Sequence, residues 1–69
     1  MSDISVTVEH RGSTTVVKLP EGSKVSDVLV QMKLFADAHI VIKGKTPVPL
    51  NAEVMDGEML KVLKVASGG

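Results

Sequence analysis

The chain of 69 residues contains no cysteine, so it forms no disulfide, no thiolate metal site and no cysteine nucleophile. Phe35 is the single aromatic residue, and eight basic residues balance eight acidic ones. Nucleic-acid-binding surfaces combine excess positive charge with aromatic side chains on which bases stack. We therefore expect no nucleic-acid partner, and any thiol chemistry must come from a partner protein.

Long apolar runs are also missing. No stretch approaches the roughly 20 residues that span a bilayer, and the first residues lack the basic start and apolar run of a signal peptide. We expect a cytoplasmic protein without membrane contact. Hydrophobic residues make up 43% of the chain and charged residues 23%, as in globular proteins. A chain this short holds one small domain, here residues 1–65, and we expect it to be a monomer.

The N-terminal part has the pattern of a β-hairpin. In residues 4–8 apolar side chains alternate with polar ones, which predicts a strand with Ile4, Val6 and Val8 facing inward. Residues 10–13 are typical of a turn. Residues 14–19 are rich in β-branched side chains and predict a second strand, with Val17 and Leu19 buried.

One amphipathic helix follows. Apolar residues recur at the i, i+3, i+4 and i+7 spacing of a helix that buries one face, at Val25, Val28, Leu29 and Met32. Ser23 is the predicted N-cap. Asp27 falls in the first turn, where the helix dipole favours negative charge.

The second half of the chain predicts short strands. Residues 39–43 form a β-branched strand, residues 46–49 with their two prolines form a turn or a sheet edge, and residues 50–54 form a short edge strand. Residues 59–65 form the last strand, with Leu60 and Val62 on its inner face. The predicted fold class is α+β, a mixed sheet of four to five strands with one helix packed on one face. Three methionines are expected to fill gaps in this core: Met32, Met55 and Met59.

Residues 66–69 form a tail that ends in Gly68 and Gly69. Its residues have almost no side chain to dock, so we expect it to be flexible. Glycine is narrow and adopts backbone angles closed to other residues, which suits a chain end that enters an enzyme channel. The alternative is that the two glycines arise by chance or belong to a linker.

The whole chain resembles the ubiquitin-like β-grasp family, most closely small archaeal modifier proteins, the small subunit of molybdopterin synthase and the thiamine-pathway sulfur carrier. Four short motifs carry this resemblance, and their order and distance from the C-terminus match the family. They are Pro20-Glu21-Gly22 with Val25-x-x-Val28-Leu29, then Val48-Pro49-Leu50, Asp56-Gly57-Glu58, and Leu60-x-Val62 running into the Gly68-Gly69 tail.

The resemblance implies a reaction in which this chain is the cosubstrate and not the enzyme. An E1-like adenylating enzyme uses ATP to convert the Gly69 carboxylate into an acyl-adenylate. In one branch a lysine of a target protein takes the glycyl group. In the other, sulfur replaces the adenylate, and the thiocarboxylate supplies a sulfur-accepting synthase in molybdopterin, thiamine or tRNA thiolation. A third hypothesis is an interaction domain whose glycine tail is incidental. We expect no bound cofactor.

The resemblance also implies a partner-binding surface. Aligning Gly44 and the terminal glycines with ubiquitin places Val41, Lys61 and Leu63 on the exposed face of the sheet. Strand alternation agrees for the last strand, because inward Leu60 and Val62 leave Lys61, Leu63 and Val65 facing outward. The alternative is that scattered apolar residues are normal on a protein surface.

Two other features of the sequence, a possible phosphate-binding loop and the two histidines, do not predict a functional site. Gly44-Lys45-Thr46 resembles the end of a phosphate-binding loop, but the first glycine of that motif is missing and no helix follows. His10 lies in the predicted turn, and neither it nor His39 has a nucleophile beside it in the sequence. Two separated histidines without a cluster of carboxylates do not make a metal site.

Overall fold

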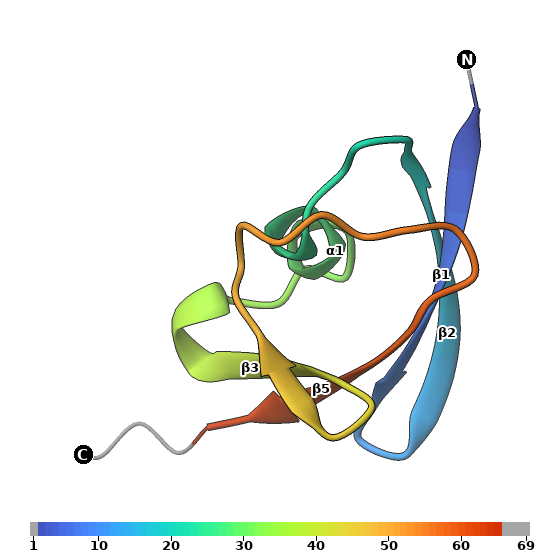
Figure 1. Ribbon diagram of the computed structural model, residues 1–69. Helices are drawn as coiled ribbons and strands as arrows, with labels where there is room; N and C mark the ends of the chain where they lie inside the picture. The colour runs from blue at the N-terminus through green and yellow to red at the C-terminus, as the bar shows by residue number, and fades with distance from the viewer. Residues whose placement is uncertain (1, 66–69) are drawn as a thin grey trace.

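The computed structural model describes residues 2–65, which form one sheet and two helical segments (Figure 1). The elements are β1 (Asp3–His10), β2 (Ser13–Pro20), α1 (Val25–Gln31), the 3-10 helix η1 (Ala36–Ala38), β3 (His39–Lys43), β4 (Thr46–Val48) and β5 (Met59–Lys64). The strand order is β2-β1-β5-β3-β4. Only β1 and β5 run parallel among these neighbouring pairs. The predicted mixed sheet with one helix on one face is confirmed.

The hairpin of β1 and β2 closes through a two-residue turn. His10 pairs with Ser13, and Arg11 and Gly12 between them have φ angles of 54° and 79°. Positive φ at both positions is typical of the type I′ turn, whose twist matches that of the flanking strands. The predicted hairpin is therefore confirmed, but His10 ends a strand and does not lie in the turn.

The core lies between the sheet and α1. Its buried apolar residues are Ile4, Val6, Val8, Val17, Leu19, Val25, Val28, Leu29, Val41, Val54, Leu60 and Val62. Every residue predicted to face inward from the hairpin, the helix and the last strand is in this set or, for Met32, packs against it. The core prediction is wrong for Met55 and Met59, whose exposed fractions are 58% and 67%.

The start of α1 differs from the prediction. Lys24, not Ser23, occupies the N-cap position. The backbone N–H of Lys24 donates to the Asp27 carboxylate at 2.9 Å, whereas the Ser23 hydroxyl donates to the carbonyl of Pro20 at 2.7 Å. Because its hydroxyl is used by the preceding turn, Ser23 does not cap the helix, and Asp27 satisfies an N–H from inside the first turn.

The predicted edge strand at residues 50–54 is wrong. The carbonyl of Ala52 accepts the Val25 N–H, and that of Leu50 accepts the Ser26 N–H, each at 2.9 Å. The first N–H groups of a helix have no partner within it, so this segment serves the start of α1 and does not extend the sheet. The sheet ends instead at β4, which confirms the sheet-edge reading of the proline-containing stretch.

Candidate docking face and root of the tail

The last strand, β5, has one buried and one exposed face. Leu60 and Val62 are each 2% exposed on the helix side. Lys61 and Leu63 alternate with them and point to the opposite face, where Leu63 is 37% exposed. The outward direction predicted for these two residues is confirmed, because successive side chains of a strand point to opposite faces.

Neighbouring strands add apolar residues to the same outer face. In β3, Ile40 lies directly opposite Leu63 and Ile42 opposite Lys61, and Ile40 is 45% exposed. Val65 continues the line of β5, since its N–H donates to the Ala38 carbonyl at 2.8 Å, and it is 40% exposed. We call Ile40, Ile42, Leu63 and Val65 the outer patch.

Val41 was expected on this face, and that expectation is wrong. Val41 is 1% exposed and lies opposite the buried Val62. The alignment on Gly44 is displaced by one residue, and a one-residue displacement moves every side chain of a strand to the other face. The run Ile40-Val41-Ile42 is apolar throughout, so alternation in the sequence did not reveal the error. The outer residues Ile40 and Ile42 were missed for the same reason.

Polar residues border the outer patch. Lys61 lies between Ile42 of β3 and Glu9 of β1 in the strand pairing. Beyond Lys61 on the same face, Thr7 of β1 adds a polar side chain opposite Met59, which is itself apolar and exposed. An apolar centre with a charged or polar rim is the usual composition of a protein-docking surface. The arrangement therefore provides a place where a protein could bind, although single apolar residues on a surface would not.

The predicted reactive residues, Gly68 and Gly69, lie outside the described residues. Val65, a member of the outer patch, is the last described residue, and Gly69 follows it by four positions. A protein that covers the outer patch therefore lies beside the point where the tail leaves the sheet. The outer patch is next to the start of the tail because Val65 belongs to both, whatever the conformation of the tail.

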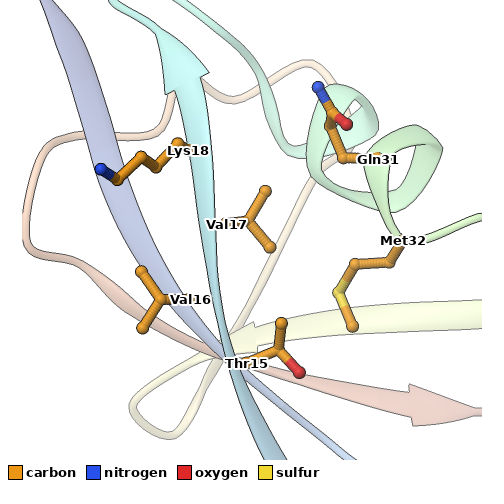
Figure 2. A pocket seen from close by; sticks show the side chains of 6 residues that line it. All are labelled: Thr15, Val16, Val17, Lys18, Gln31 and Met32. Carbon is orange, nitrogen blue, oxygen red and sulfur yellow. The ribbon is translucent and has the colours of Figure 1, made fainter.

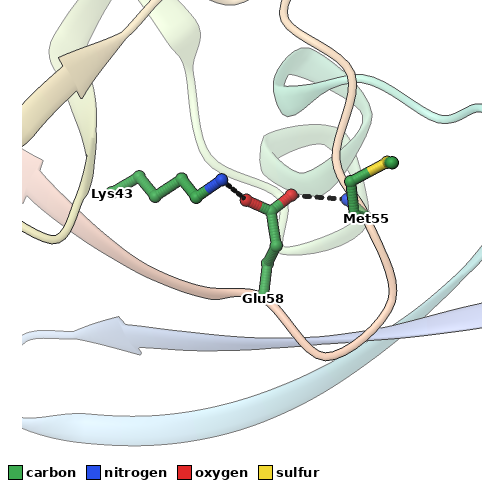
Figure 3. Close-up of polar contacts among 3 residues, drawn as sticks. All are labelled: Lys43, Met55 and Glu58. Carbon is green, nitrogen blue, oxygen red and sulfur yellow. Dashed lines mark hydrogen bonds and ion pairs between the residues drawn. The ribbon is translucent and has the colours of Figure 1, made fainter.

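The loop that leads into β5 is held by the partly buried carboxylate of Glu58. Figure 3 shows Glu58 between two partners: its carboxylate pairs with the ammonium of Lys43 and accepts the backbone N–H of Met55. The Glu58 side chain is 11% exposed and that of Lys43 is 56% exposed. The hydrogen bond to Lys43 lowers the pKa of Glu58 below its ordinary value, against the opposing effect of desolvation. These contacts tie the entry of β5 to the end of β3.

The same loop is also bonded to β1. The Ser5 N–H donates to the Asp56 carboxylate at 2.8 Å, and the Gly57 N–H donates to the Ser5 carbonyl at 2.8 Å. The carbonyl of Glu58 accepts the Thr7 N–H at 2.9 Å. Because β5 begins at the next residue, these bonds set which of its residues face outward.

The two histidines meet on the helix side of the sheet. Their ring centroids are 5.5 Å apart in an edge-to-face arrangement, and Nδ1 of His39 lies 2.8 Å from the Phe35 carbonyl oxygen. Nε2 of His10 is buried without a hydrogen-bond partner among the described residues. Within residues 2–65, no group of three or more histidine, cysteine, aspartate or glutamate residues is placed to hold a metal ion.

No helix in the described part of the chain is long and apolar enough to cross a membrane.

Sequence comparison finds no matching protein-family model and no matching curated protein. Solved structures, by contrast, match closely in fold. The ubiquitin of Caldiarchaeum subterraneum is 15% identical over 99% of this chain and 100% of its own, with a TM-score of 0.74. The N-terminal ubiquitin-like domain of the 4931431F19Rik protein is 18% identical over 97% of this chain and 79% of its own, with a TM-score of 0.76.

A third similar structure is a complex. ATBAG1, solved in complex with HSP70, is 7% identical to this chain. The match covers 91% of this chain and 41% of ATBAG1, with a TM-score of 0.79. At these identities the likeness concerns the fold alone. The fold is ubiquitin-like β-grasp, as the sequence motifs predicted.

Proposed function

We propose that this chain is a ubiquitin-like protein modifier whose Gly69 carboxylate is adenylated by an E1-like enzyme and conjugated to lysines of target proteins. The carboxylate attacks the α-phosphate of ATP and pyrophosphate leaves. A lysine amine then attacks the acyl carbon, AMP leaves with its electron pair, and an isopeptide bond forms. This chain provides the carboxylate and a surface that an enzyme can hold.

The observation that carries the proposal is the position of the outer patch. Ile40 and Leu63 are exposed side by side, and Val65 is the residue from which the tail continues toward Gly68 and Gly69. An enzyme that binds this patch would bring its active site near the tail. The ubiquitin-like fold supports the same reading, since an archaeal ubiquitin is similar over its full length.

The first experiment detects what becomes of the Gly69 carboxylate. The purified protein is incubated with ATP and a lysate of its source cells, and the products are digested with trypsin and analysed by mass spectrometry. Cleavage after Lys64 should leave residues 65–69 attached to lysines of other proteins. Deletion of Gly68 and Gly69 should abolish these branches while circular dichroism stays unchanged. Branches that persist after the deletion would contradict the proposal.

The same experiment distinguishes conjugation to lysines from the alternative function, sulfur transfer. A dedicated sulfur carrier would give an intact chain with one terminal oxygen replaced by sulfur, and no branches on other proteins. An interaction domain would give neither product. Both results are distinct from conjugation because they leave the lysines of other proteins unmodified.

A second experiment tests the outer patch itself. Leu63→Arg places a charge at its centre and should reduce conjugation strongly, because an unpaired charge is costly to bury in an interface. Val30→Arg is the matched control, since Val30 is 72% exposed and lies on α1, on the other side of the sheet. Equal activity of the two variants would show that the enzyme docks elsewhere.

A further inference from the structure

His10 and His39 are far apart in the sequence and meet because of the strand order. His10 ends β1, His39 begins β3, and both strands pair with β5. Both side chains lie on the inner face of the sheet, in line with the buried Val8 and Val41 of the same strands. Their ring centroids are 5.5 Å apart. The fold therefore brings together two side chains that no sequence motif connects.

The hydrogen bond of His39 determines which of its ring nitrogens is free. Nδ1 lies 2.8 Å from the Phe35 carbonyl oxygen, and a carbonyl only accepts hydrogen bonds. Nδ1 therefore carries the proton, and Nε2 of the neutral ring carries the lone pair. A histidine that binds a metal almost always donates its other ring N–H to a carbonyl, a carboxylate or water. His39 is held in the same way.

His10 provides a second nitrogen. Its Nε2 is buried and has no hydrogen-bond partner among residues 2–65, although buried polar atoms are nearly always paired. A buried polar atom without a partner lowers the stability of the fold unless another group binds it. A metal ion on the lone pair of this nitrogen would remove that cost.

The distance between the two rings fits two ligands of one ion. Zn²⁺ binds histidine nitrogen at about 2.0–2.1 Å in a tetrahedral arrangement. Two imidazoles bound to one ion in this way have their ring centroids about 5 Å apart, close to the 5.5 Å between His10 and His39. Water can fill the remaining positions. The site therefore does not need the third histidine, cysteine or carboxylate that residues 2–65 do not provide.

A groove gives an ion and its water ligands a route from solvent. Ser13 of β2 pairs with His10, and Thr15, the next residue of β2 on the inner face, lines a groove between β2 and the end of α1. Figure 2 shows Met32 across this groove from Thr15. The groove thus begins one inner position away from His10.

The donor atoms select the kind of ion. Imidazole nitrogen suits Zn²⁺ and other transition-metal ions, whereas Mg²⁺ and Ca²⁺ prefer carboxylate and carbonyl oxygen. Charges of both signs flank His39: Asp37 lies two residues before it, and Lys64 lies opposite it in β5. The flanking charges therefore do not exclude a cation.

We propose that His10 and His39 bind one Zn²⁺ ion through their Nε2 atoms, with water in the remaining coordination positions. The ion links β1 to β3 across β5, next to the Ala38 carbonyl that accepts the N–H of Val65. Because only the folded chain holds the two rings together, zinc stabilises the folded state. The site lies on the inner face and the outer patch on the opposite one, so this proposal and the proposed conjugation can fail independently.

The test is a titration of zinc chloride into the full-length ¹⁵N-labelled protein slightly above neutral pH, followed by long-range ¹H–¹⁵N spectra of the histidine rings. We expect the Nε2 signals of both histidines to shift together and to saturate at one zinc ion per chain. Thermal unfolding should move to higher temperature in the presence of zinc. Magnesium chloride is the control and should change neither measurement.

Variants test the two ligands separately. His10→Gln and His39→Gln should each weaken zinc binding by at least about tenfold, since loss of even an outer partner of a ligating histidine typically costs about 10–100-fold. Backbone amide spectra check that each variant keeps the fold. Lys64→Gln is the matched control, because it makes the same kind of change opposite His39 and leaves both ligands in place. It should not weaken binding.

Three results would overturn the proposal. Ring nitrogens that do not shift at millimolar zinc would mean that water alone serves the buried nitrogen of His10. A shift at one histidine only, or binding that survives either glutamine variant, would indicate adventitious binding to a single side chain. Saturation at one zinc ion per two chains would mean that the ion joins two molecules and not two strands of one.

Discussion

The two faces of β3 and β5 are nearly identical in residue type but opposite in environment. Val41 is 1% exposed and its neighbour Ile40 is 45% exposed, although both are β-branched residues of one strand. On β5, Leu60 is 2% exposed and Leu63 is 37% exposed. Hydrophobicity alone therefore does not distinguish these core residues from their exposed counterparts on the same strands. What distinguishes them is whether they lie on the side of the sheet that α1 covers.

The largest expected effect comes from the two leucines of β5. Leu60→Ala leaves a cavity in a packed core and should lower the free energy of unfolding by about 2–5 kcal/mol. Leu63→Ala removes the same atoms from a partly exposed site and should cost less than about 1 kcal/mol. Urea unfolding of the two variants measures the difference. Similar losses would mean that Leu63 belongs to the core and that the outer patch is wrongly placed.

The second prediction tests the face assignment in β3. Val41→Thr keeps the shape of the side chain and buries a hydroxyl, which should cost about 1–3 kcal/mol. Ile40→Thr changes a residue of the outer patch, where water can bind the hydroxyl, and should cost less than about 1 kcal/mol. The reverse order in thermal or urea unfolding would restore the alignment on Gly44 and return Val41 to the docking face.

The third prediction concerns the carboxylate that holds the entry to β5. Because the folded-state pKa of Glu58 is lowered, its contribution to stability is present above the unfolded pKa and is lost as the pH falls through the folded pKa. The ion pair is partly exposed, so the contribution should be about 0.5–1 kcal/mol and smaller in high salt.

Urea unfolding of Glu58→Gln at pH 7 and pH 3 checks this. The variant should lose less stability on acidification than the unmodified protein. Glu21→Gln, which changes an exposed carboxylate, is the control and should follow the unmodified protein. A pH dependence that is unchanged in Glu58→Gln would rule out the contribution.

The smallest effect is expected where the helix that covers the inner face ends. Lys33 has a φ angle of 60°, and the Leu34 N–H donates to the Leu29 carbonyl at 2.9 Å, as in a helix end that favours glycine. Lys33→Gly should raise the free energy of unfolding by about 0.5 kcal/mol, because glycine adopts positive φ without a Cβ clash. Lys33→Ala should give no gain. A gain of equal size from alanine would assign the effect to the lost charge.

Much of this fold could be predicted from local patterns. The alternation in residues 4–8 identified the inner face of β1, and the helical spacing of Val25, Val28 and Leu29 identified the buried face of α1. The predictions were wrong in two situations. In one, every residue of a strand was apolar, so alternation could not show which face is buried. In the other, backbone groups expected to pair within the sheet pair with the helix. Residues 50–54 pair with the start of α1 and not with the sheet, and nothing in their own sequence indicates that choice.

Of the residues of the candidate site, some could likewise be placed from the sequence and others could not. Lys61 and Leu63 could be placed on the outer face because Leu60 and Val62 alternate with them, whereas Ile40 and Ile42 could not be distinguished from Val41. Gly68 and Gly69 were predicted from their residue type, their place after the last strand and the family resemblance, and their reactive role stays a prediction. The contact between the two histidines was not predicted, because strand order decides which strands lie side by side.

The sequence by itself determined the hairpin, the amphipathic helix, the inward residues of β5 and the presence of two glycines after the last strand, because each depends on spacing within one short segment. The tertiary structure alone decided which face of β3 is exposed and whether the two histidines meet. The physical reason is that both depend on the pairing of β5 with β3 and with β1, in which each strand takes its face and its hydrogen-bond partners from its neighbour.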